Sequence, residues 1–310
     1  MFIRGDAMQM YQQINKNKRN TVFFIIVFIG LIFIASYFIG YLIDPALSYS
    51  FAGIALILAG VGVFLSYYNS DKMILKMANA RPVSKAQEPY LYHTIEGVAI
   101  AAGIPTPKAY VIETDIPNAF ATGRNPEHGV VAVTRGLIDR LNREELEGVI
   151  AHEMAHIKNY DILYSSIVIV LAGTLVYIAE FASRSMMFGG GNRNNNSNNK
   201  GNPVMLIIGI VTIILAPILA KIVQMAVSRS REYLADATAA RMIGYPRGLA
   251  SALHKIAEYS NPQQAKQAGI ASEATASLFI VNPLLKPSQL NNLFSTHPPI
   301  DKRIEALNKM

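Results

Sequence analysis

Two long apolar runs stand close together near the start of the chain. Residues 21–43 and 49–68 contain no charged side chain, and each run is about as long as the roughly 20 residues that a helix needs to cross a bilayer. Only the short segment DPALS separates them, so the pattern predicts a hairpin of two transmembrane helices. A cleaved signal peptide is the alternative, but the first run is too long for one, no A-x-A-like cleavage site follows, and a second run comes at once.

Two further apolar runs, residues 162–181 and 204–227, lie in the second half of the chain. The segment between them, residues 189–202, is rich in Asn and Gly, cannot bury a core and is expected to be disordered. The length of the two runs favours two more crossings of the membrane. A shallow or re-entrant pair is the alternative.

The remaining residues form two polar regions, 71–161 and 228–310. The first contains strand-like runs rich in β-branched residues at 108–113 and 129–134, with room for an edge strand at 118–122. A helix is expected to begin after Asn142, which is a good N-cap, because Glu145 stands at the reciprocal capping position. Region 228–310 reads as helices broken at Pro- and Gly-containing turns. The chain therefore divides into a tail and hairpin (1–70), a first polar part (71–161), an apolar pair (162–227) and a second polar part (228–310).

Charge supports a membrane partner. Basic residues flank the hairpin and the turn inside it has none; they are Arg4, Lys16, Lys18 and Arg19 before it and Lys72, Lys76, Arg81 and Lys85 after it. The positive-inside rule then places the N-terminus and the residues after 68 in the cytoplasm. The net charge of +7 is not arranged as a basic stripe interleaved with aromatic residues, so we expect the lipid bilayer and no nucleic acid as a partner. The chain has no cysteine, which leaves His, Asp and Glu as candidate metal ligands.

The helix that begins near Asn142 carries the sequence HEMAH. Residues four apart on a helix are neighbours, so the imidazoles of His152 and His156 can face one ion. Glu153 is not needed as a ligand and can accept a proton from a zinc-activated water that attacks a carbonyl. Chance produces this motif in on the order of one per cent of chains this long. The capped helix, its separate apolar face and a third ligand downstream favour a catalytic Zn²⁺ site.

The strongest candidate for that third ligand is Glu232 in REYLAD, although alone this segment would read as an ordinary solvated helix. Asp236 lies one turn later, where it can hold a ligand histidine by its free ring N–H. His297 stands before two prolines and could donate to an oxyanion or a substrate carbonyl. The other histidines have no partner pattern and are interpreted as structural or surface residues: His93, His128 and His254.

These motifs together resemble the HtpX family of membrane zinc metalloproteases, relatives of the CAAX-prenyl protease Ste24. Besides the hairpin, the likeness includes PNAFATG (117–123), VIAHEMAHIKNYD (149–161), SRSREYLADATAA (228–240) and FSTHPPIDKRIEAL (294–307), in that order. It implies a multi-pass α-helical membrane protein with a mainly helical α+β, zincin-like metalloprotease domain that contains a small β-sheet. The Asn-rich segment is not part of the family pattern.

The resemblance also implies roles for individual residues. His152, His156 and Glu232 would hold one Zn²⁺, with Glu153 as the catalytic base. Asp236 would support a ligand, and His297 would stabilise the tetrahedral intermediate. An edge strand would align an extended substrate by strand addition; its residues are Asn118, Ala119, Phe120, Ala121 and Thr122.

The function that follows is a zinc-dependent endopeptidase of the cell membrane, with its active site at the cytoplasmic face. Its polypeptide substrates would be misfolded membrane proteins, in quality control under stress. A protease that cleaves inside the bilayer is one alternative, but the charges at both ends of the HEMAH helix make it too polar for the hydrocarbon region. A non-catalytic metal-binding chaperone or adaptor is another; Glu153 argues against it, since a purely structural site keeps no idle base beside the metal.

Overall fold

The membrane-directed part of the protein is a helical hairpin. The structure is a computed structural model that describes residues 2–171, 229–269, 275–286 and 297–310. Helix α1 (Phe2–Ile43) and helix α2 (Ser48–Met77) are joined by the short 3₁₀ turn η1 (Pro45–Leu47), whose N-cap is Asp44. Judged by length and composition alone, both helices are long and apolar enough to cross a membrane. The predicted pair of long apolar helices is therefore confirmed.

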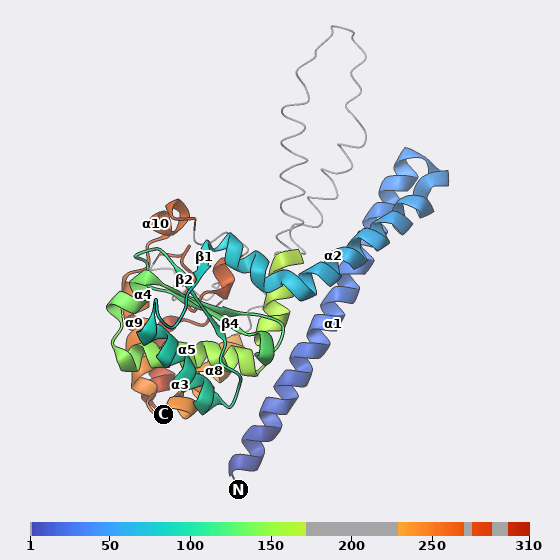
Figure 1. Ribbon diagram of the computed structural model, residues 1–310. Helices are drawn as coiled ribbons and strands as arrows, with labels where there is room; N and C mark the ends of the chain where they lie inside the picture. Colours follow the sequence, from blue (N-terminus) through green and yellow to red (C-terminus); the bar gives the residue numbers. More distant parts are fainter. Residues whose placement is uncertain (1, 172–228, 270–274, 287–296) are drawn as a thin grey trace.

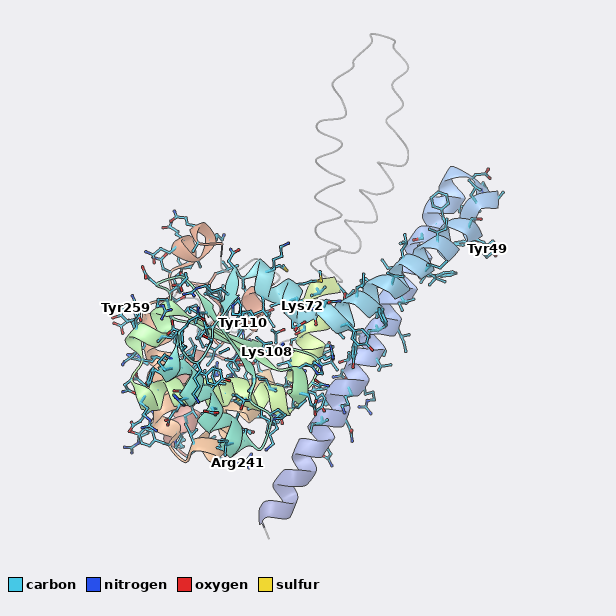
Figure 2. The ribbon with its side chains drawn as sticks, in the orientation of Figure 1. Tyr49, Lys72, Lys108, Tyr110, Arg241 and Tyr259 are labelled. Carbon is cyan, nitrogen blue, oxygen red and sulfur yellow. The ribbon has the colours of Figure 1, made fainter. Side chains whose placement is uncertain are left out.

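The hairpin extends away from a compact domain (Figure 1). Tyr49 lies near its far end and Lys72 lies where α2 reaches the domain (Figure 2). Large apolar side chains along the hairpin are exposed, as expected for a surface that faces lipid; they include Phe23, Ile26, Ile57, Leu58 and Phe64.

The third predicted run is described only in part. Residues 162–171 belong to an apolar helix over Asp161–Leu171 that is almost entirely buried in the protein. Phe24 and Phe28 of α1 pack against Leu163 and Tyr164 on it. Residues 172–181, the Asn-rich segment and the fourth run lie outside the described residues. Crossings beyond the hairpin therefore stay a prediction.

A four-stranded mixed sheet with strand order β1-β2-β4-β3 lies in the domain. Strand β2 (Lys108–Ile112) runs parallel to β4 (Val130–Thr134), and β3 (Ala119–Thr122) pairs antiparallel with β4 at one edge. These three strands confirm the expected runs. The fourth, β1 (Ala80–Pro82), was not expected, because three residues carry no alternating pattern and proline fits only an edge strand.

Helices and loops cover both faces of the sheet, because successive strand residues point to opposite sides. One face, which includes Ala121 and Val131, packs in one core with α3 (Pro89–Ala102) and α5 (Arg143–Lys158). The other face, which includes Phe120 and Ala132, packs against the end of α2 and against Phe279. The remaining elements are α4 (Arg135–Arg140), α8 (Arg229–Ile243), α9 (Pro246–Glu258), α10 (Pro262–Gln267), α12 (Ile300–Asn308), η2 (Pro126–His128) and η3 (Ala276–Leu278).

Helix α5 begins as the sequence predicts. The Asn142 side chain accepts from the Glu145 amide, and the Glu145 carboxylate accepts from the Asn142 amide, each at 2.9 Å. Glu145 is buried, and it also accepts from Ser251 Oγ at 2.6 Å and from Lys255 Nζ at 2.7 Å. The start of α5 is thereby tied to α9, and α8 packs on α5 as well.

Candidate metal centre

The two histidines of HEMAH face each other inside the domain. His152 Nε2 lies 3.1 Å from His156 Nε2, and the two ring planes are almost perpendicular. Glu153 lies between them in sequence and is buried. The opposite side of α5 is fully apolar and buried in the core, through Leu146, Ile150, Met154 and Ile157. The amphipathic pattern of the helix thus separates its core side from its polar side.

Helix α8 brings Glu232 to the same point. Its two carboxylate oxygens lie 3.6 Å from His156 Nε2 and 3.6 Å from His152 Nε2. Zinc bonds of about 2.0–2.2 Å at tetrahedral angles would place ligand atoms about 3.3–3.6 Å apart. Among the described residues, His152, His156 and Glu232 are the group that could hold a metal ion. One ligand atom of each lies within 4.8 Å of the other two. The separations fit one zinc-sized ion.

The hydrogen bonds on the far side of each ring explain why this cluster suits a cation. His152 Nδ1 lies 2.9 Å from Asp236 Oδ1, and His156 Nδ1 lies 2.9 Å from Asp161 Oδ2. A neutral imidazole that donates from Nδ1 keeps a lone pair on Nε2. Two such lone pairs then meet the Glu232 carboxylate, and its Oε2 accepts no hydrogen bond from any described residue. Two ring nitrogens and a carboxylate that converge in this way form a donor set that suits a divalent cation such as zinc.

The electrostatics of the buried groups favour positive charge in the site. Burial opposes charge on His152, but the nearby carboxylates of Asp236 and Glu232 raise its pKa to about 9. Burial also opposes charge on Asp236, but the Arg303 guanidinium holds the pKa of this carboxyl at about 2. Burial raises the pKa of Glu153 above its usual range. The site therefore attracts positive charge, and it contains one carboxyl that takes up a proton more readily than usual.

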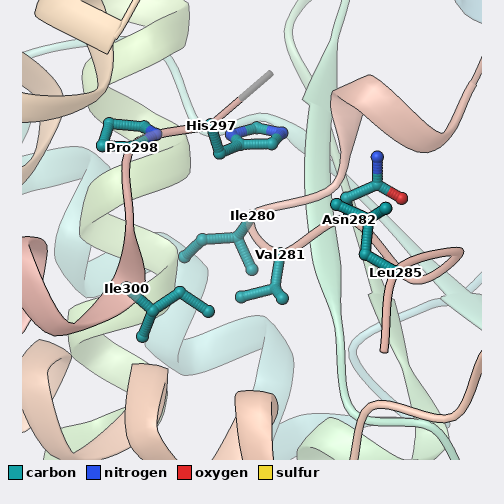
Figure 3. A pocket seen from close by; sticks show the side chains of 7 residues that line it. All are labelled: Ile280, Val281, Asn282, Leu285, His297, Pro298 and Ile300. Atoms are coloured by element: carbon teal, nitrogen blue, oxygen red, sulfur yellow. The ribbon is translucent and has the colours of Figure 1, made fainter. Parts of the chain in front are cut away.

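His297 and Arg303 reach the site from the C-terminal segment. His297 Nδ1 lies 3.4 Å from Glu232 Oε2, and its ring stands at one side of a mainly apolar cavity (Figure 3). That cavity is also lined by Ile280, Val281, Asn282, Leu285, Pro298 and Ile300. Arg303 is fully buried and donates to both oxygens of Asp236, at 2.8 and 2.7 Å. It also donates to the Ile280 carbonyl at 3.1 Å.

Part of the expected substrate strand is already hydrogen-bonded to another segment of the protein. The Ile280 amide donates to the Ala119 carbonyl at 2.9 Å, and Asn118 Nδ2 donates to the Val281 carbonyl at 2.7 Å. Outward backbone groups alternate along an edge strand, so those of Ala121 point the same way as those of Ala119. Ala121 lines a second, open cavity together with Glu153, His156 and Glu232. Phe120 is buried in the core, Thr122 Oγ1 contacts Ser166 Oγ, and both residues pair with β4.

The sequence reasoning missed two residues of the site. Arg303 left a signal, because it occupies a core position between Ile300 and Leu307 on the amphipathic helix α12. No sequence pattern pointed to Asp161, because its approach to His156 depends on a left-handed turn at Tyr160. The three histidines that were interpreted as structural or surface residues have exposed side chains.

Comparisons with known proteins agree with the motifs. The family model for peptidase family M48 matches residues 85–310. A protease HtpX homolog of Dictyoglomus thermophilum is 45% identical over 305 residues, which are 97% of this chain and 94% of the relative. The homolog of Ligilactobacillus salivarius is 42% identical and covers 97% of this chain and 100% of the relative. The homolog of Pyrococcus furiosus is 50% identical over 247 residues, covering 80% and 82%.

Among solved structures, the crystal structure of S. mikatae Ste24p matches with a TM-score of 0.49 at 19% identity, covering 83% of this chain and 58% of that one. The family match spans well over half of the chain, and the relatives match it almost end to end. The resemblance to HtpX is confirmed. The chain therefore belongs to peptidase family M48 and is a membrane metalloprotease.

Proposed function

We propose that this protein is a zinc-dependent endopeptidase in which His152, His156 and Glu232 hold one Zn²⁺ and Glu153 is the catalytic base. The observation that supports this most is the convergence of two imidazole Nε2 atoms and the Glu232 carboxylate at one point. Glu153 lines the same open cavity as His156 and Glu232, so a base lies next to the proposed metal site.

A zinc ion bound there would polarise the substrate carbonyl and lower the pKa of a water molecule. The Glu153 carboxylate accepts the proton of the attacking water and passes it to the amine of the leaving peptide. Burial favours this transfer, because it raises the pKa of Glu153 toward the working pH. The His297 ring donates to the oxygen of the attacked carbonyl as negative charge develops on it. Ala121 aligns the substrate backbone from the edge of the sheet.

We further propose that the substrates are misfolded membrane proteins and that the active site faces the cytoplasm. The support for the orientation is the charge at the two ends of the hairpin. Lys72 of α2 stands where that helix reaches the domain (Figure 2), Lys18 of α1 lies over the Tyr160 ring of the domain, and the η1 turn at the tip has no basic residue. Under the positive-inside rule, the end with the domain is cytoplasmic.

The test is Glu153→Gln in the purified full-length protein, with a detergent-solubilised membrane protein as substrate. Zinc content by elemental analysis should stay at one per chain, because Glu153 is not a ligand. Cleavage should fall by roughly 10²–10⁴-fold, because the general base is lost. Glu144→Gln, on the exposed side of the same helix, is the control and should cleave like the parent. Normal cleavage by Glu153→Gln would remove Glu153 from the mechanism.

A further inference from the structure

The membrane hairpin touches the turn that follows the HEMAH helix. Asn17 of α1 is fully buried, and its Nδ2 donates to the Asn159 carbonyl at 2.9 Å and to Asp161 Oδ1 at 2.5 Å. The ammonium of Lys18, the next residue, lies 4.3 Å from the centre of the Tyr160 ring. Two neighbouring residues of α1 thus hold three consecutive residues at the end of α5.

The backbone of this turn is strained and depends on contacts from surrounding residues. Tyr160 has a φ of 59°, in the left-handed region that is costly for a bulky residue and persists only where surrounding contacts hold it. The bend turns the chain back so that the Asp161 carboxylate reaches His156. Part of the cost is offset by the two contacts from α1.

Asp161 divides its two oxygens between the hairpin and the metal centre. Oδ1 accepts from Asn17, whereas Oδ2 lies 2.9 Å from His156 Nδ1. Among the described residues, Arg231 of α8 is the charged group that faces Asp161 from another element, at 3.7 Å from Oδ1. A carboxylate that is fixed at both oxygens cannot rotate freely, so the His156 ring it holds is also fixed, with Nε2 aimed at Glu232.

The position of Asn17 on α1 singles it out. Asn17, Thr21, Phe24 and Phe28 are all buried and follow the spacing of one helix face. The two phenylalanines pack on the Asp161–Leu171 helix, and Thr21 Oγ1 donates within its own helix to the Asn17 carbonyl. Asn17 is therefore the one member of this stripe whose side chain reaches toward the metal centre.

We propose that Asn17 is a positioning residue for the metal centre: acting through Asp161, it sets the orientation of His156. The hairpin is then part of the framework of the active site as well as its anchor. This inference rests on the proposed zinc site. It concerns the support of the second histidine, because the first is held from the opposite side by Asp236 and Arg303.

The experiment measures metal binding by the full-length protein in detergent. Asn17→Leu keeps the size of the side chain but removes the donor. Zinc affinity, measured by competition with a chelating dye, should fall about tenfold, in the range found for partners of metal ligands, and the visible spectrum of the Co²⁺-substituted protein should shift. Thr21→Val, on the same stripe, should change the affinity less than twofold and leave the spectrum unchanged.

A double-variant cycle tests the route through Asp161. In an Asp161→Asn background, Asn17→Leu should weaken zinc binding by less than a further twofold, because the carboxylate it acts through is already gone. A full tenfold loss in that background would overturn the inference, because the effect would then come from general packing. Unchanged affinity and an unchanged spectrum in Asn17→Leu alone would overturn it as well.

If Asn17→Leu does not fold, Asn17→Ser replaces it, since serine stays polar but is too short to reach Asp161, and the same expectations apply. The inference and the proposed function can fail separately. A parent protein that takes up no zinc would overturn the metal site itself. A parent that binds zinc normally, with Asn17 variants that do the same, would overturn only the role of Asn17.

Discussion

The Arg303 guanidinium has no exposed surface, and its Nε and Nη2 groups donate to the two carboxylate oxygens of Asp236. The pair explains how a carboxylate can stay charged at the centre of the domain and still hold His152. Asp236 neutralises much of the buried positive charge, and Arg303 in turn prevents Asp236 from taking up a proton. Such pairs contribute little net stability while intact, but they are costly to break on one side only.

Arg303→Met should therefore destabilise the domain by roughly 3–5 kcal/mol, because it leaves the Asp236 charge buried without its partner. Thermal or denaturant unfolding of the detergent-solubilised protein measures this. Its neighbour Lys302, whose side chain is 67% exposed, provides the control: Lys302→Met should stay within about 0.5 kcal/mol of the parent. An Arg303→Met protein as stable as the parent would show that Asp236 does not depend on Arg303.

The residues that were predictable are those fixed by helix geometry alone. His152 and His156 had to face the same way, being four apart on a capped helix, and Asp236 had to lie one turn from Glu232. Asn17 and Asp161 could not be found this way. Their contact joins positions 144 apart in the chain, and no local pattern encodes it.

Helices α5 and α9 cross at a short distance. A methyl group added at Gly148 would lie 2.6 Å from the Leu249 amide nitrogen, and one added at Gly248 would lie 2.5 Å from the Glu144 carbonyl oxygen. The two backbones approach each other through glycines, which is what allows Ser251 and Lys255 to reach Glu145.

Gly148→Ala should push α9 away from α5 and destabilise the protein by about 1–3 kcal/mol, the usual cost of overpacking. Unfolding measurements test this against Gly97→Ala on α3, where an added methyl group meets nothing within 4 Å. Because alanine favours a helix more than glycine does, the control should be neutral or stabilised by up to about 1 kcal/mol. Equal behaviour of the two variants would contradict the close crossing.

Glu145 links the same two helices through its charge and makes their contact depend on pH. Burial opposes its ionisation, but Lys255, Ser251 and Asn142 together hold the pKa of this carboxyl below its usual value. A carboxyl with a lowered pKa in the folded state stabilises the protein above its ordinary pKa, and this contribution is lost as the pH falls through the folded value.

Glu145→Gln removes the charge but keeps the reciprocal cap, which glutamine also makes. Near neutral pH the variant should be less stable than the parent by about 1 kcal/mol. The difference should shrink as the pH falls below the ordinary carboxyl pKa, because the parent then loses the same charge. Unfolding midpoints of both proteins from pH 7 downward measure this. A gap that stays constant with pH would mean that the charge is not the cause.

At the scale of elements, the strongest local patterns were also the most reliable predictions. β2 and β4 were expected because β-branched residues cluster in them, and α5 because of its cap. The covering of β3 by residues 280–281 was not expected. It depends on Asn118 meeting a segment 163 positions away. The proposed substrate strand is therefore longer in the sequence than the part of β3 that lines the open cavity, which among the described residues is Ala121.

For the molecule as a whole, the proposed orientation can be tested by labelling. The chain contains no cysteine, so an introduced one reacts alone. Leu47→Cys, in the turn at the hairpin tip, should react with a membrane-impermeant maleimide added to intact cells. His254→Cys, on the exposed side of α9, should react only after the cells are permeabilised. The reverse pattern would place the domain outside the cytoplasm.

The contact between Asn17 and Asp161 also sets the distance between the domain and the uncharged run of α1. Asn17 stands four positions before Thr21, where the uncharged run of α1 begins, which is about 6 Å along a helix axis. With the hairpin in the bilayer, the carboxylate that holds His156 then lies at the level of the lipid headgroups. Under the proposed function, a membrane-protein substrate would meet the proposed metal centre at that depth, close to where its own membrane segment enters water. The hairpin would then set how far from the hydrocarbon a substrate's peptide bond is cut.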